Sequence, residues 1–202
     1  MPPIVIPRAS NKSVQVTDKH FIYTPEGSRT IVWLSNFNDK NLTIILGLDQ
    51  EANFCDLRSF EGTFPTCLHW GVGTVLYGVR TARDPPEICI LDVFHYKGVC
   101  LKHLPLSERT KVCANCASEM QATTDILPPV LRTSLPLMGS NPFTDLFDVK
   151  YPVSSVYVFD PASFWLPGGE TLKSVVATLG GPDRMKYMLV GKTDVSDIFI
   201  LQ

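Results

Sequence analysis

Short apolar runs rich in β-branched and aromatic residues dominate the first half of the chain. Runs of this kind, separated by turn residues, predict half-buried β-strands. Four of them follow one another, at Val14–Val16, Phe21–Tyr23, Thr30–Leu34 and Leu42–Leu48. We expect a meander of short antiparallel strands. The segment Thr24–Arg29 is expected to be a hairpin loop, because Pro25 and Gly27 suit the corners of a tight turn.

Further strands are predicted along the rest of the chain. The segment Leu68–Arg80 contains a strand after a Gly-x-Gly break, and Glu87–Tyr96 follows the turn Asp84-Pro85-Pro86, so these two predict a second hairpin. Strand-like runs recur at Ser154–Phe159 and Met185–Val190. The apolar end Ile198–Leu201 is expected to be buried or docked.

Helical periodicity is rarer. Ser107 is a suitable N-cap, Glu108 suits the helix dipole, and apolar residues follow at helical spacing; these are Val112, Cys113, Cys116, Ala117 and Met120. A shorter amphipathic segment covers Gly169–Leu179. Antiparallel sheets with one or two packed helices predict an α+β fold.

Composition and charge restrict the class of protein to which the chain can belong. The 202 residues are 45% hydrophobic and 19% charged, with a formal net charge of −2. We expect one globular domain at 20–202 behind an extended arm at 1–19. No basic run offers a footprint for a phosphate backbone, and no apolar run has the length of a membrane span. Three prolines among the first eight residues disfavour a secretory signal, so we expect a reducing compartment and free thiols.

The order of several motifs resembles a known family. Thr24–Arg29 has the frame Lys-x-Asp-Gly-x-Arg of nucleotidyltransferase motif I, Ile88–Gly98 resembles motif III, and Tyr151–Phe159 resembles the strand of motif IV. Lys186 and Lys192 stand where a motif V lysine pair would fall. The arrangement is similar to the nucleotidyltransferase domain of mRNA capping enzymes without its OB-fold, and to the cap-binding domain of snurportin.

Two departures bear on catalysis. The family uses the motif I lysine as a covalent nucleophile, but Thr24 stands at that position, and Ser154-Ser155 replaces the metal-binding acid of motif IV. The resemblance therefore implies a chain that is not an enzyme and that needs no cofactor or metal. It also implies vestigial ligand-binding positions, at Glu26, Arg29, Asp92, Lys186 and Lys192. Each has a plainer interpretation as a turn residue, a paired ion or a solvated lysine.

A second resemblance suggests where the protein works. Gly73–Gly78 and Asp92–Gly98, followed by Leu104–Arg109, are similar to uncharacterised proteins of large nucleocytoplasmic DNA viruses. It implies a minor capsid protein that assembles with other viral structural proteins, located in the virion and, during assembly, in the host cytoplasm.

Two other functions remain open from the resemblance. One is binding of an RNA cap or guanine nucleotide between a tryptophan and the group of Glu26, Arg29 and Asp92. The candidate tryptophans are Trp33, Trp70 and Trp165, although single tryptophans on strands commonly anchor a core. The other is residual nucleotidyl transfer from a lysine at another position.

Cysteine spacing gives a separate hypothesis. Cys100 and His103, followed by Cys113 and Cys116, have the Cys-x2-His and Cys-x2-Cys spacings of a tetrahedral zinc site. The second pair lies within the predicted helix, where burial of small apolar thiols also explains the pattern. Both interpretations stay open at this level.

Overall fold

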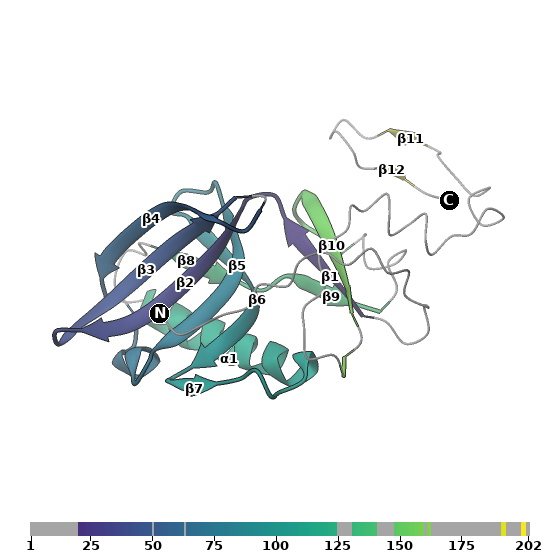
Figure 1. Ribbon diagram of the computed structural model, residues 1–202. Coiled ribbons are helices and arrows are strands. Elements are labelled where there is room, and N and C mark those ends of the chain that lie inside the picture. Colours follow the sequence, from purple (N-terminus) through teal and green to yellow (C-terminus); the bar gives the residue numbers. More distant parts are fainter. Residues whose placement is uncertain are drawn as a thin grey trace.

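The computed structural model describes residues 20–49, 51–62, 64–124, 131–140, 148–159 and 161–162, and the backbone of 191–192 and 199–200. Its main element is a strongly curled seven-stranded sheet with the order β4-β3-β2-β5-β6-β7, to which β8 adds beside β6 (Figure 1). The strands are β2 (Ser28–Phe37), β3 (Lys40–Leu48), β4 (Phe54–Glu61), β5 (Thr74–Thr81), β6 (Glu87–Tyr96), β7 (Val99–Cys100) and β8 (Arg132–Ser134). All the ladders are antiparallel except that of β6 with β8.

Local turn chemistry sets the hairpins. Asn38 and Asp39 adopt positive φ angles of 51° and 61°, as the two corners of a tight two-residue hairpin require. The register of β2 with β3 then runs from Phe37 opposite Lys40 to Thr30 opposite Gly47. The predicted hairpin on either side of the proline turn is confirmed, because β5 pairs antiparallel with β6.

A second, three-stranded sheet has the order β10-β1-β9. It consists of β1 (His20–Pro25), β9 (Leu137–Gly139) and β10 (Val153–Phe159), and in Figure 1 it lies to one side of the larger sheet. The prediction that residues 24–29 form a hairpin loop was wrong, since β1 pairs with β9 and β10 and not with β2. The turn instead carries the chain from one sheet to the other.

Two apolar clusters make up most of the core. The first lies between the large sheet and the helix α1 (Leu106–Thr124), and it joins Leu34 and Ile90 of the sheet to Cys116 and Met120 of the helix. The second joins the large sheet to the small one, through Tyr157 and other residues of both sheets. The 3-10 helix η1 (Thr66–His69) contributes Leu68 to the first cluster.

The predicted α+β class was therefore wrong. Of the described residues, 53% lie in strands and 17% in helix, and α1 is the one α-helix among them. The physical reason is that the second face of the large sheet buries its apolar residues chiefly against another sheet, so strands take the place of further helices. The fold is mostly β.

Some expectations fall outside the described residues. They are the arm at 1–19 with its strand Val14–Val16, the helix Gly169–Leu179 and the strand Met185–Val190. Near the end of the chain, β11 (Gly191–Lys192) pairs with β12 (Phe199–Ile200). None of the helices described here combines the length and the apolar character needed to cross a membrane.

Candidate functional site

The motif I position lies at the end of β1, where Thr24 is fully buried. Its hydroxyl donates to the backbone oxygen of Ser155 at 2.9 Å and lies 2.7 Å from the Ser155 hydroxyl. The Ser154 hydroxyl is 3.3 Å from Thr24 and donates to the backbone oxygen of Pro25 at 3.0 Å. The motif I-like and motif IV-like segments therefore do meet, as neighbouring strands. Where they meet they present a cluster of bonded hydroxyls, with neither an amine nor a carboxylate in it.

Glu26 and Arg29 flank the turn that follows β1. Glu26 is exposed, whereas Arg29 is half-buried and donates a hydrogen bond to the backbone oxygen of Asp49. Gly27 packs so closely on β5 that a Cβ atom there would lie 2.3 Å from the backbone oxygen of Arg80. The motif I-like glycine is thus required by the contact between turn and sheet, and Arg29 ties the start of β2 to the end of β3.

Asp49 organises the turn between β3 and β4. Its Oδ1 accepts backbone hydrogen bonds from Asn53 at 2.8 Å and from Glu51 at 2.9 Å. The Asn53 bond is the main cause that lowers the pKa of Asp49, and the charge of Arg29 adds to it. The carboxylate therefore acts as a turn cap.

Two tyrosines connect the two sheets close to Arg29. The phenol of Tyr157, on β10, hydrogen-bonds with Tyr77 of β5 and with Ser155. Burial raises the pKa of Tyr157 and Tyr77 raises it further, while the charge of Arg29 opposes the shift. The pair is a neutral polar contact inside an otherwise apolar layer, and neither tyrosine was singled out from the sequence.

Asp92, the acid of the motif III-like strand, is 1% exposed. Its carboxylate receives two hydrogen bonds from Arg109 of α1, at 2.8 Å to Oδ1 and 2.9 Å to Oδ2. The backbone N–H of Val93 also donates to Oδ1 at 2.8 Å. Burial raises the pKa of Asp92, and the Arg109 guanidinium opposes that rise. Each carboxylate oxygen thus has a partner within the fold.

Of the five predicted site residues, Glu26, Arg29 and Asp92 are described with their side chains. No hydrogen bond or ion pair within the described part of the chain joins Glu26, Arg29 and Asp92 to one another. Lys192 is placed only by its backbone, opposite Phe199, and Lys186 lies outside the described residues. Their roles in ligand binding stay predictions.

The two described tryptophans, Trp33 and Trp70, lie away from this turn. Trp33 is half-buried and donates from Nε1 to the backbone oxygen of Val72 at 2.8 Å, while Trp70 is 60% exposed. Trp70 comes shortly before Thr74, the first residue of β5, which lies opposite Leu34 of β2. Leu34 is five residues along β2 from Arg29. At the rise of a β-strand this separation is about 17 Å. The described residues therefore do not bring an exposed tryptophan to Arg29, and Trp165 lies outside them.

The candidate zinc ligands are dispersed. No group of three or more His, Cys, Asp or Glu residues with metal-binding geometry occurs in the described part of the chain, which contains all four candidates. His103 is exposed, whereas Cys113 and Cys116 are buried in the first apolar cluster. Burial raises the pKa of Cys116 to about 12 and that of Cys113 well above its usual range. The geometry supports the interpretation of these two thiols as core residues.

Sequence reasoning missed Arg109, the partner of Asp92. A signal for it existed, because Arg109 lies four residues before Cys113 and seven before Cys116, on the apolar face of the helix. A charged residue on such a face requires a buried partner. Asp92, in the middle of an apolar strand, carries the same signal.

Comparisons with known proteins give little beyond the geometry. No protein-family model matches the sequence, and no curated protein matches it. Among solved structures, the chain is similar to the ligase domain of LigD from M. tuberculosis, with 14% sequence identity and a TM-score of 0.46. The likeness covers 81% of this chain and 54% of the other. The chain thus spans about half the length of that ligase domain.

Proposed function

We propose that this chain is a non-catalytic structural protein of a large DNA virus particle, a minor capsid component that works by protein–protein assembly. The viral setting rests on the resemblance of Gly73–Gly78 and Asp92–Gly98 to proteins of such viruses. The absence of catalysis and the assembly role rest on separate observations.

The observation that carries the proposal is the environment of Thr24. Nucleotidyl transfer of the capping type requires an amine that attacks the α-phosphate. The residue in that position is a buried threonine whose hydroxyl is bonded to Ser155, and no base lies among its hydrogen-bond partners. Asp92, the other acid of the resemblance, neutralises Arg109. These contacts support a scaffold whose former site positions hold the fold together.

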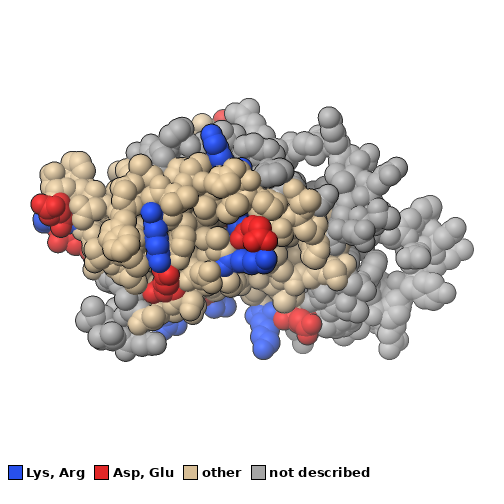
Figure 2. Space-filling model, turned by 90° about the horizontal axis from the view of Figure 1, so that it is seen from below, with Lys and Arg blue, Asp and Glu red and all other residues tan. Residues whose placement is uncertain are grey.

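The surface supports assembly. Eight large apolar side chains are exposed in the described part of the chain: Phe37, Phe54, Leu57, Trp70, Val72, Val99, Leu135 and Met138. Two of them, Phe54 and Leu57, lie on the one strand β4, and contiguous exposed apolar side chains are typical of protein–protein contacts. On the face in Figure 2, lysines and arginines lie singly, several beside an acid, without a broad patch of either sign. Such a surface suits a protein partner better than a phosphate backbone.

A labelling experiment tests the absence of catalysis. The purified chain is incubated with α-labelled GTP or ATP and Mg²⁺ or Mn²⁺, resolved under denaturing conditions, and compared with a capping enzyme. We expect no label on the chain, in wild type or in Thr24→Ala. An acid-labile label on the wild-type chain would contradict the proposal, because it would reveal a phosphoramidate formed by a lysine elsewhere.

Nucleotide titration tests the cap-binding alternative. We expect no saturable change in tryptophan fluorescence with GTP or methylated cap analogues up to millimolar concentration. Saturable binding that Arg29→Ala abolishes and Arg83→Ala leaves unchanged would favour cap recognition over assembly. Arg83 is a matched control because it is an arginine in an exposed ion pair with Glu87.

A further inference from the structure

The long open edge of the large sheet is formed by β4. Within the described residues it pairs with β3 alone, and six of its eight residues are exposed. The opposite end of the sheet order, β7, has two residues. Very short edge strands protect a sheet from pairing with other chains, whereas a long edge presents a row of unpaired backbone N–H and C=O groups.

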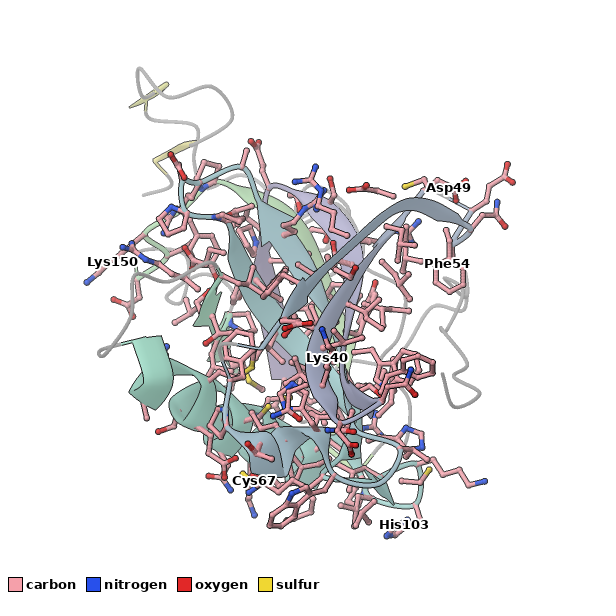
Figure 3. The ribbon with its side chains drawn as sticks, turned by 90° about the vertical axis from the view of Figure 1, so that its left-hand side faces the viewer. Lys40, Asp49, Phe54, Cys67, His103 and Lys150 are labelled. Atoms are coloured by element: carbon pink, nitrogen blue, oxygen red, sulfur yellow. The ribbon has the colours of Figure 1, made fainter. Side chains whose placement is uncertain are left out.

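An apolar patch, formed by Phe54 and Leu57, adjoins this edge. Leu57 is 69% exposed and lies opposite Leu46, and Phe54 is 59% exposed and lies opposite Leu48. Directly opposed residues in a ladder share a face of the sheet. Leu48 belongs to the second core cluster and Leu46 packs against it, so the apolar patch continues that cluster. Figure 3 shows Phe54 at the periphery of the molecule, close to Asp49. The core between the sheets thus continues to two exposed apolar side chains beside the β4 edge.

The charges of β4 are self-complementary. Asp56 and Arg58 stand on either side of Leu57, in the order Phe54-Cys55-Asp56-Leu57-Arg58-Ser59-Phe60. An antiparallel pairing of two copies centred on Leu57 would place Asp56 of each copy opposite Arg58 of the other. Within one chain Arg58 is bonded to Asp56 at 3.2 Å, and Asp56 also accepts from Arg80 at 3.1 Å. Arg58 is the exposed partner, so it is free to turn to the second copy while Arg80 stays on Asp56.

We infer that β4 is the contact through which this chain pairs with a second copy of itself, edge to edge, about a two-fold axis at Leu57. The pairing joins the two large sheets into one continuous sheet. It brings the two Leu57 side chains together on the same face of that sheet. It also provides hydrogen-bond partners for the unpaired backbone N–H and C=O groups of both β4 edges. A closed two-fold contact of this kind uses the same patch on both partners. The inference deepens the proposed function, on which it rests, by naming one assembly contact.

Charge exchange tests the pairing. Asp56→Lys places a second cation opposite Arg58 of the other copy, and Arg58→Glu places two acids opposite each other, so each variant alone should be pushed toward monomer. Mixed in equal amounts, the two variants restore both opposite-charge pairs and should form a mixed dimer. We expect sedimentation velocity at micromolar concentrations to show dimer for wild type, at least about tenfold weaker dimerisation for each variant, and recovery in the mixture. Lys111→Glu, an exposed charge change on α1, is the matched control and should dimerise as wild type.

A cross-linking measurement keeps the test decisive if a charge variant fails to fold. In a Cys55→Ser background, Leu57→Cys should form an intermolecular disulfide on mild oxidation, because the two residues face each other across the axis. Phe37→Cys, equally exposed but at the end of β2, should not. A wild-type chain that sediments as a monomer, or equal cross-linking of both cysteine variants, would overturn the inference. Incorporation into particles is measured separately, so failure of the pairing is distinguishable from failure of the proposed function.

Discussion

Asp92 of β6 and Arg109 of α1 form a two-pronged ion pair in the interior, with side chains 2% and 4% exposed. The pair links the helix to the sheet, and the Arg109 guanidinium also donates to the backbone oxygen of Leu104, just before the helix begins, at 3.1 Å. An acid in a motif III-like strand is in this way used for packing. The first prediction concerns this ion pair.

Replacing Arg109 by Met should destabilise the chain strongly. The substitution keeps the length of the side chain but leaves the Asp92 carboxylate buried without its counter-charge, a change that typically costs about 3–5 kcal/mol. Urea unfolding followed by tryptophan fluorescence measures the free energy of unfolding. The double variant Asp92→Asn/Arg109→Met should recover a large part of the loss, because no buried charge remains.

The pH dependence of that variant provides a further check. Burial already raises the pKa of Asp92, and loss of Arg109 removes the interaction that opposes the rise. The folded state of Arg109→Met should therefore hold a proton more tightly than the unfolded state. Its deficit in unfolding free energy relative to wild type should narrow as the pH falls from 7 toward 3.8, the ordinary pKa of an aspartate. A deficit that stays constant over this window would contradict the assignment.

Two buried histidines should make the wild type sensitive to acid. Burial lowers the pKa of His69 and that of His95, and within the described part of the chain Nε2 of His69 and Nδ1 of His95 have no hydrogen-bond partner. Below the ordinary value of 6.5 the unfolded chain binds more protons than the folded chain, so the free energy of unfolding should fall as the pH drops through that value. The double variant His69→Gln/His95→Gln should show a flatter profile between pH 7 and 5. His103→Gln, at an exposed position, should leave the slope unchanged; an equal flattening there would refute the explanation.

Two glycines separated by one residue should differ sharply in their tolerance of alanine. Gly73 has a φ of +87°, and a Cβ there would lie 1.9 Å from the backbone oxygen of Leu34. Gly71 has a φ of +60°, and a Cβ would meet only the Cα of Gly98, at 3.3 Å. We expect Gly73→Ala to cost about 2–4 kcal/mol and Gly71→Ala about 1 kcal/mol. Thermal unfolding of the two variants compares them, and equal losses would contradict the packing described here.

Cysteine reactivity should separate surface from core. Alkylation requires the thiolate, and burial raises the pKa of Cys89 and of Cys116 to about 12. With iodoacetamide at pH 8, Cys55, which is exposed, should react first, and Cys89, Cys113 and Cys116 only after unfolding. Mass spectrometry of timed samples measures the order. Rapid alkylation of Cys116 in the native chain would contradict its place in the core.

The sequence allowed the inner strands and the helix to be predicted, for local reasons. Thr30–Leu34, Leu42–Leu48 and Glu87–Tyr96 are dense in β-branched residues because both faces of their strands are largely buried. The edge strand β4 was missed because it contains no β-branched residue, its apolar residues do not alternate with polar ones, and it carries Asp56 and Arg58. Exposure of six of its eight residues removes the pattern on which strand prediction depends.

Pairing over long distances could not be predicted. The partner of His20 is Phe159, and no local signal indicates which of several apolar strands a segment at the start of the chain will choose. This is why the turn after β1 was interpreted as a hairpin loop and why the second sheet was missed. At the candidate site, the resemblance singled out Thr24, Ser154 and Asp92 as motif positions. The contact between Thr24 and Ser154 depends on the long-range pairing of β1 with β10, and the Asp92–Arg109 pair depends on packing between a strand and a helix.

We propose that the chain assembles into a virus particle as a non-catalytic component. The most direct measurement is quantitative mass spectrometry of purified virions, stripped in steps with detergent and then with salt. We expect the chain to stay with the capsid shell, at a fixed ratio to the main shell protein, until the shell itself comes apart. Its absence from the particles, or its loss at the first detergent step with no fixed ratio, would contradict the claim.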